Sequence, residues 1–363
     1  MIKKIITILL AITLLSVPVY AQEAEYNQAE RIQYSTALRG ALRNRPVLTQ
    51  LDDIIDDVQE MREDLQSLLE LRRAAGTITR AEEAQMVRQI ANLGAQLTRM
   101  RTDQEMYRIR TEFAMRSSIT AINNAELNIE LLIASLEHER ALLVNTRMRV
   151  EAGLASESDL RAAELALEVQ ESNLAENLLT LETQRQSLNQ ILQRPVTADL
   201  YIYFEREMLE FPTDLNAHIR RYAPRQPNVR RSYTYYNRAR AELRDFTTST
   251  PEWREAERAR NNTRREYNDI LRRVETDMRN HYNTLNAMQH NIQSLEINLL
   301  RENERLEAVT LNYQAGLATR FDIEAAQLAV LRAETAIEQA LNNYWNVQFA
   351  FEHPFLIPMV GGR

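Results

Sequence analysis

The chain has 363 residues, of which 26% are charged and 44% hydrophobic, and its formal net charge is −7. Cysteine is absent, which excludes disulfides, thiolate chemistry and cysteine-bound metals. The acidic balance argues against nucleic acid as a partner. Only 7 glycines and 9 prolines occur, and this scarcity is typical of long helices and coiled coils. We therefore expect an all-α protein.

The start of the chain, positions 1–21, has the pattern of a secretory signal peptide. Lys3 and Lys4 precede an apolar stretch from Ile5 to Val17, and Val19-Tyr20-Ala21 offers a small-residue cleavage site. An uncleaved membrane anchor is the alternative, but the apolar run is short for one and Pro18 breaks it. Lys3 and Lys4 are the only lysines of the chain. Cleavage would therefore reduce the number of basic residues from 44 to 42 against 51 acidic residues, and the mature chain would have a net charge near −9. We expect an exported protein whose mature part has no membrane-spanning helix.

Apolar residues recur at steps of three and four along several long segments, which indicates helices that pack side by side at a shallow angle. Residues 80–152 contain no proline and a single glycine, and residues 252–315 have a similar pattern. These segments would be roughly 110 and 96 Å long at ~1.5 Å per residue. Helices of that length must lie along neighbours of similar length.

The two halves of the chain repeat each other. Ala152 to Glu171 aligns without gaps with Ala315 to Glu334, and ten of the twenty positions are identical. An early proline also occurs in each half, at Pro46 and Pro227. An internal duplication explains both observations. The expected organisation is a signal peptide (1–21), a first helical-hairpin repeat (22–195), a linker (196–213), a second helical-hairpin repeat (214–352) and a C-terminal tail (353–363).

Each repeat contains an Ala-Gly-Leu sequence where one long helix ends and the next begins shortly after. Gly153 and Gly316 can adopt the left-handed backbone that ends a helix, and Leu154 and Leu317 follow them at the expected hairpin tips. Any capped helical hairpin would use such residue types. That reading does not explain why the tip occurs twice in one chain.

The helices that follow the tips have candidate capping residues. Ser156 or Ser158 can cap the first of them, and Thr319 can cap the second. Asp159 and Asp322 fall in the first turn, near the positive end of the helix dipole.

The duplicated Gly-Leu-x-x-x-x-Asp tips, the Ala-rich and Leu-periodic helices after them and the early proline of each half resemble the outer-membrane efflux protein family, the TolC-like exit ducts. The resemblance covers roughly Ala29 to Glu352. It implies a homotrimer whose twelve long helix strands form a hollow cylinder. It also implies that the hairpin tips dock a periplasmic adaptor (membrane-fusion) protein and an inner-membrane transporter.

The resemblance further implies a gate between the tips. Tyr313 and Asp159 match a polar link in the family, and Asp322 matches an acidic ring that narrows the entrance. Two other family positions differ, because an acidic residue is Ala325 here and an arginine is Ala318. Only part of the family's gate is therefore matched by residues of this chain.

The membrane part of the family also differs. Each family repeat has a β-hairpin between its early helix and its long helix, and a spanning strand needs ~9–11 residues. The matching joints, Arg72 to Arg80 and Arg244 to Pro251, are too short. We expect the helical duct without the outer-membrane β-barrel strands. The expected location is the cell envelope, either the outer membrane by resemblance or the periplasm because these strands are missing.

No catalytic, cofactor or metal site is expected. The five histidines are scattered and read as solvated helix surface, and neither a Gly-rich phosphate loop nor a Gly-x-Ser-x-Gly elbow occurs. We therefore do not expect an enzyme. The alternative function is a non-conducting helical scaffold or adaptor-like protein of the cell envelope.

Two segments allow a second interpretation. Arginines alternate with tyrosines from Arg220 to Arg244, a composition that can bind polyanions. We favour a helix whose tyrosines pack and whose arginines pair with acids of neighbouring helices. The apolar segment from Phe349 to Val360 can contact a membrane or a partner, but docking back onto the bundle is the favoured reading.

Overall fold

The computed structural model describes residues 30–203 and 212–356, which form eight α-helices, two 3₁₀ turns and two short strands. In chain order the elements are β1 (Glu30–Gln33), α2 (Tyr34–Arg43), α3 (Pro46–Ala74), α4 (Arg80–Glu151), α5 (Glu157–Ile191), β2 (Leu200–Tyr203), α6 (Leu215–Tyr222), η3 (Ala223–Arg225), α7 (Pro227–Glu242), η4 (Leu243–Asp245), α8 (Pro251–Gln314) and α9 (Arg320–Glu352). The all-α expectation is confirmed. The predicted signal peptide lies outside the described residues, as do parts of the predicted linker and tail.

The two long helices predicted from the periodicity are continuous. Helix α4 has 72 residues and α8 has 64. Helix α4 begins at a capping box, in which the backbone N–H of Thr79 donates to Glu82 Oε2 (2.9 Å) and the N–H of Glu82 donates to Thr79 Oγ1 (3.3 Å). Helix α8 begins at Pro251, where a missing N–H costs nothing, after Thr250 as its N-cap. None of the described helices is apolar enough over a sufficient length to cross a membrane.

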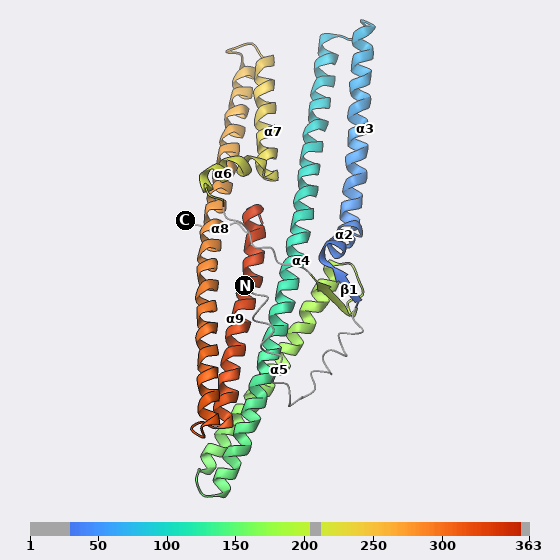
Figure 1. Cartoon of the computed structure of the whole chain (residues 1–363). Helices are drawn as coiled ribbons and strands as arrows, with labels where there is room; N and C mark the ends of the chain where they lie inside the picture. The colour runs from blue at the N-terminus through green and yellow to red at the C-terminus, as the bar shows by residue number, and fades with distance from the viewer. Residues whose placement is uncertain (1–29, 204–211, 357–363) are drawn as a thin grey trace.

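The long helices lie side by side in one row (Figure 1). In the upper part of Figure 1 the order across the row is α8, α7, α4 and α3; in the lower part it is α8, α9, α4 and α5. Helices α4 and α8 run through both parts. Helix α8 therefore forms one edge of the row, while α3 above and α5 below form the other edge.

The order α2–α3–α4–α5 of the first half is repeated as α6–α7–α8–α9 in the second. The copies differ in length, because α3 has 29 residues and α7 has 16. The α3–α4 hairpin consequently extends beyond the α7–α8 hairpin at the upper end (Figure 1). Short turns without strands, residues 75–79 and 246–250, join the two helices of each hairpin.

Two apolar clusters fix the middle of the molecule. One contains Met115 and Ile119 of α4, and the other contains Leu285 of α8 with Tyr344 and Phe351. Burial of each such side chain contributes ~1.5–3 kcal/mol before the entropy cost. Phe351 is 1% exposed, so the described start of the apolar C-terminal segment docks onto the bundle, as favoured from the sequence.

A small parallel sheet, which the sequence did not reveal, ties the predicted linker to the first repeat. Strand β1 pairs with β2 in the register Glu30↔Leu200 to Gln33↔Tyr203. The side-chain amide of Asn189 donates to the carbonyl oxygens of Val196 (3.0 Å) and Ala198 (2.8 Å) just before β2. The chain between the repeats is thus held against α5 before it crosses to α6.

Candidate functional site

The first hairpin tip is a tight, fully hydrogen-bonded helix end. Gly153 follows α4 with φ of 71°, the left-handed conformation that glycine adopts without strain. Its N–H donates to the carbonyl of Val150 (2.9 Å), and the N–H of Leu154 donates to that of Arg149 (2.7 Å). This pair of bonds is the Schellman motif, which satisfies the last free carbonyls of a helix.

The second tip repeats the first in the other half of the chain. Gly316 has φ of 73°, its N–H donates to Tyr313 O (2.9 Å), and the N–H of Leu317 donates to Asn312 O (2.8 Å). The predicted left-handed glycines are thereby confirmed at both tips. Both tips lie at the lower end of the molecule in Figure 1, and the α4–α5 tip reaches further than the α8–α9 tip.

The helices after the tips start with matching capping boxes. Of the two candidate serines, Ser156 is the N-cap of α5, and Asp159 Oδ2 accepts from its N–H at 2.9 Å. At the start of α9, Asp322 Oδ2 accepts from the N–H of Thr319 at 2.7 Å. The backbone hydrogen bond from the N-cap residue, joined by its hydroxyl, lowers the pKa of each aspartate below its ordinary value. The aspartates therefore have a local structural role in addition to any role at the entrance.

The three predicted gate residues lie at these tips. Asp159 and Asp322 are exposed in the first turns of α5 and α9, and Tyr313 is 46% exposed near the end of α8. Within the described chain no hydrogen bond joins Tyr313 to either aspartate, and both carboxylates are bound to their own N-cap residues. A link between the tips stays a prediction.

The tips also expose their leucines to an unusual degree. Leu154 is 71% and Leu317 is 80% exposed. Each leucine stands between a Schellman helix end and a capped helix start.

A line of amides joins the two repeats where α4 packs against α9. Asn342 Nδ2 donates to Asn124 Oδ1 (2.8 Å), and Gln339 Nε2 donates to Asn128 Oδ1 (2.7 Å). Asn342 is 2% exposed and the other three amides are half-buried, and a buried amide costs free energy when unpaired, so these two bonds favour one register of α9 along α4. These bonds were not predicted from the sequence, since polar residues spaced along a leucine-rich helix are typical of an exposed face.

Arg116 of α4 is the centre of a second contact between the repeats. Its guanidinium carbon lies 4.3 Å from the ring centroid of Trp345 and 4.4 Å from that of Phe349, and its Nε donates to the Tyr34 hydroxyl (3.1 Å). Burial, joined by the charge of Arg116, lowers the pKa of the nearby His353 to about 4. His353 is therefore neutral at pH 7.

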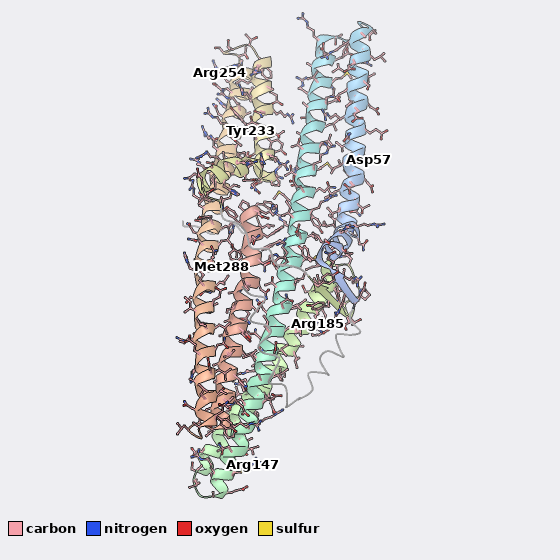
Figure 2. The ribbon with its side chains drawn as sticks, in the orientation of Figure 1. Asp57, Arg147, Arg185, Tyr233, Arg254 and Met288 are labelled. Carbon is pink, nitrogen blue, oxygen red and sulfur yellow. The ribbon has the colours of Figure 1, made fainter. Side chains whose placement is uncertain are left out.

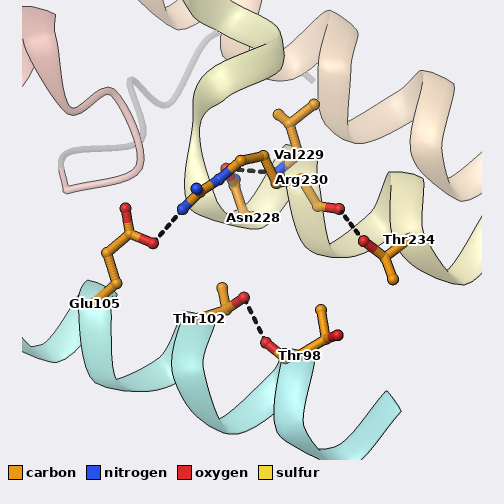
Figure 3. A network of polar contacts seen from close by, with 7 residues as sticks. All are labelled: Thr98, Thr102, Glu105, Asn228, Val229, Arg230 and Thr234. Carbon is orange, nitrogen blue, oxygen red and sulfur yellow. Dashed lines mark hydrogen bonds and ion pairs between the residues drawn. The ribbon is translucent and has the colours of Figure 1, made fainter. Parts of the chain in front are cut away.

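Ion pairs connect α4 to α7 in the upper part of the row. Arg230 pairs with Glu105 (Figure 3), and Arg231 pairs with Asp103 at 2.7 Å. Tyr233 packs on Tyr267 of α8, with 5.3 Å between ring centroids. The favoured interpretation of the Arg/Tyr-rich segment is confirmed for Arg230 and Arg231, which pair with acids of a neighbouring helix, and for Tyr233 and Tyr236, which pack on Tyr267.

The interpretation of all five histidines as solvated helix surface is wrong for His281, and His138, His218 and His353 are half-buried instead of solvated. His281 of α8 is 1% exposed and lies in the apolar middle of the molecule, whereas His290 is exposed. The periodicity contains the signal for this, since His281 lies four residues before Leu285 and so falls in the same apolar stripe of α8. In the described part of the chain no cluster of histidine and carboxylate residues could hold a metal ion.

Comparison with solved structures identifies the fold. The structure is similar to the outer membrane protein VceC from Vibrio cholerae (TM-score 0.60, 13% identity, 88% of this chain and 94% of that chain) and to the outer membrane channel CmeC of Campylobacter jejuni (TM-score 0.65, 12% identity, 91% and 87%). It is also similar to CusC, whose structures describe transmembrane channel formation (TM-score 0.65, 10% identity, 88% and 91%). No protein-family model and no curated protein matches the sequence. The chain has the fold of the TolC-like outer-membrane channels, and identities this low define the fold alone.

Proposed function

We propose that this chain is the duct subunit of an export system: three copies close into a helical tube through which cargo leaves the cell. Hydrolytic or redox chemistry has no part in this function. The tube wall would be the row of long helices, and the two hairpin tips of each copy would face the inner end.

The observation that carries the proposal is the pair of open, unlike edges of the helix row. On α5 the exposed Leu165, Val169 and Leu179 stand on the face opposite the packed leucines, since residues two apart on a helix point in nearly opposite directions. On α8 the exposed Ile297 and Leu300 do the same. When one edge of a subunit binds the different, opposite edge of the next copy, the copies close into a ring or grow into a filament.

Docking of a periplasmic adaptor and an inner-membrane transporter at the tips is part of the proposal. The exposed Leu154 and Leu317, on rigidly capped turns, support such contacts. Export to the cell envelope is supported by the signal-peptide pattern of residues 1–21. The gate formed by Asp159, Tyr313 and Asp322 is proposed on the family resemblance.

Native mass spectrometry and electron microscopy of the purified mature protein test the proposal. We expect a trimer with a closed outline and an open lumen. A solid rod, a filament or isolated copies would exclude the duct and leave the helical scaffold as the function.

A pair of neighbouring positions on α8 provides matched variants. Leu295 faces the packed seam and Ile297 is 69% exposed on the open edge. We expect Ile297→Asp to keep the helical content but lose the trimer, and Leu295→Asp to lose stability as well. A trimer that survives Ile297→Asp unchanged would show that this edge does not join the copies.

A further inference from the structure

The two upper edges of the helix row have opposite charge. Helix α3 contains eight acidic residues and three arginines, a net charge of −5. The first part of α8, residues 251–273, which forms the opposite edge, contains seven arginines and five acidic residues, a net charge of +2. The lower edges, by contrast, expose the leucines, isoleucine and valine described above. The upper edges therefore match each other by charge.

The acids of α3 form a stripe on its outer face. Asp53, Asp57, Glu60 and Asp64 follow one another at steps of four, three and four, so they share one face of the helix. All four are exposed, and this face lies opposite the one that buries Ile55 against α4. Asp52, which is 3.8 Å from Arg108, is the one acid of α3 with an ion pair in the described chain.

The beginning of α8 carries an arginine stripe with similar spacing. Arg254, Arg258, Arg265 and Arg272 follow at steps of four, seven and seven, and all four are exposed. Arg272 pairs with Asp269 on its own helix; the other three form no ion pair with a described residue. Figure 2 shows Asp57 on α3 and Arg254 on α8, the outermost helices at opposite sides of the upper part.

The two stripes lie at a similar level. Helix α3 ends at Ala74 and α8 starts at Pro251, both at the upper turns of their hairpins. At ~1.5 Å per residue, Asp57 is roughly 26 Å below the first turn and Arg265 roughly 21 Å below the second, and the first turn lies higher than the second (Figure 1), which brings the two residues closer in level. Both stripes also exceed one helical turn in length, so a modest offset between copies still brings opposite charges together.

We propose that the acidic stripe of α3 in one copy binds the arginine stripe of α8 in the next copy, head to tail. This inference rests on the proposed ring. It adds that charge pairing selects the head-to-tail orientation of neighbouring copies. Contact between two α3 edges or two α8 edges would bring like charges together, which disfavours it. Ile54, Met61 and Leu68, exposed beside the acids, offer apolar surface to the arginine methylene groups.

The absence of cysteine makes a crosslinking test direct. In a chain with Asp57→Cys and Arg265→Cys, a short bis-maleimide is expected to join neighbouring copies into dimers and trimers. Either single variant alone is expected to give no such products, because like edges do not meet. Raising the salt concentration from about 0.1 to about 1 M should lower the crosslinking rate at least about threefold, since it shortens the Debye length from ~10 to ~3 Å.

A second pair on the lower edges separates this inference from the proposed ring. Leu179→Cys with Ile297→Cys should crosslink copies with little dependence on salt. If this lower pair reacts and the upper pair does not, the ring stands and the charge pairing of α3 with α8 is wrong. If neither pair reacts, both proposals fail.

Charge reversal checks the direction of the contact. Asp53→Arg with Asp64→Arg, added to the upper double-cysteine chain, should lower the crosslinked yield at least about threefold. Adding Arg258→Asp and Arg272→Asp to the same chain should restore the yield. Failure of this restoration, with the lower pair still reacting, would overturn the charge pairing.

Discussion

The guanidinium of Arg116 on α4 lies 4.3 Å from the ring centroid of Trp345 on α9, so a single cation contacts both repeats of the chain. The Phe349 ring is almost as close, and Glu112 lies 3.5 Å from the same guanidinium. The two repeats are thus joined at the level where the small sheet and both apolar clusters also lie. Contacts of this kind join the helices of the two halves into a single packed row.

Removal of Arg116 should destabilise this junction. We expect Arg116→Ala to lower the free energy of unfolding by about 2 kcal/mol, because it removes three cation–π contacts, with Tyr34, Trp345 and Phe349, and leaves Glu112 without its cationic partner. Urea denaturation followed by circular dichroism measures the change. Arg110→Ala, at an exposed position on the same helix, is the control and should change stability by no more than about 0.5 kcal/mol. Equal effects of the two variants would contradict the proposed role.

The buried histidine should behave differently from an exposed one. His281→Ala removes a side chain that is 1% exposed and leaves a cavity, so we expect a loss of about 2–4 kcal/mol of stability. His290→Ala, further along on the surface of α8, should be neutral within about 0.5 kcal/mol. Thermal unfolding of the two variants side by side distinguishes them, and a neutral His281→Ala would refute the packing seen around α8.

The tip glycines should resist substitution although there is space around them. Nothing lies within 4 Å of a Cβ added at Gly153 or Gly316, so backbone strain at positive φ is the whole cost. We expect Gly153→Ala or Gly316→Ala to cost about 1 kcal/mol each. Gly94→Ala inside α4 should have the opposite sign and stabilise by about 0.5–1 kcal/mol, since that position is helical and the nearest atom is at 3.8 Å. Denaturation of the three variants measures the change in the free energy of unfolding, which should fall for the two tip variants and rise for Gly94→Ala.

The capping aspartates predict how the tips respond to pH. Hydrogen bonds from Ser156 hold the pKa of Asp159 below its ordinary value of 3.8. The charged carboxylate therefore stabilises the cap at every pH above about 3.8, and this contribution is lost as the pH falls through the lower, folded value. Hydrogen exchange of the tip amides, corrected for the intrinsic rate, should show constant protection from pH 7 to pH 5. Asp159→Asn should remove the change at low pH, and a loss of protection already at pH 6 would disprove this assignment.

The sequence predicted the helices and tips well because their signals are local. Continuous 3–4 periodicity indicated α4 and α8, and glycine or proline marked nearly every helix end, as at Gly153 and Pro251. Contacts between distant segments left no such signal. Strand β1 lies at the start of the first repeat and β2 in the linker that follows it, and the ring contacts of Arg116 depend on which face of α4 meets α9. The sequence correctly predicted that the proposed gate residues lie at the tips. It could not predict a contact between the tips, because such a contact depends on how two separate hairpins are placed relative to each other.

The unequal lengths of α3 and α7 have a consequence for anything that meets the upper end of the assembly. In a threefold ring each tall α3–α4 hairpin would alternate with a short α7–α8 hairpin. The rim would then have three projections separated by three notches. A partner bound to this rim would meet threefold symmetry, although each chain presents two hairpins to it.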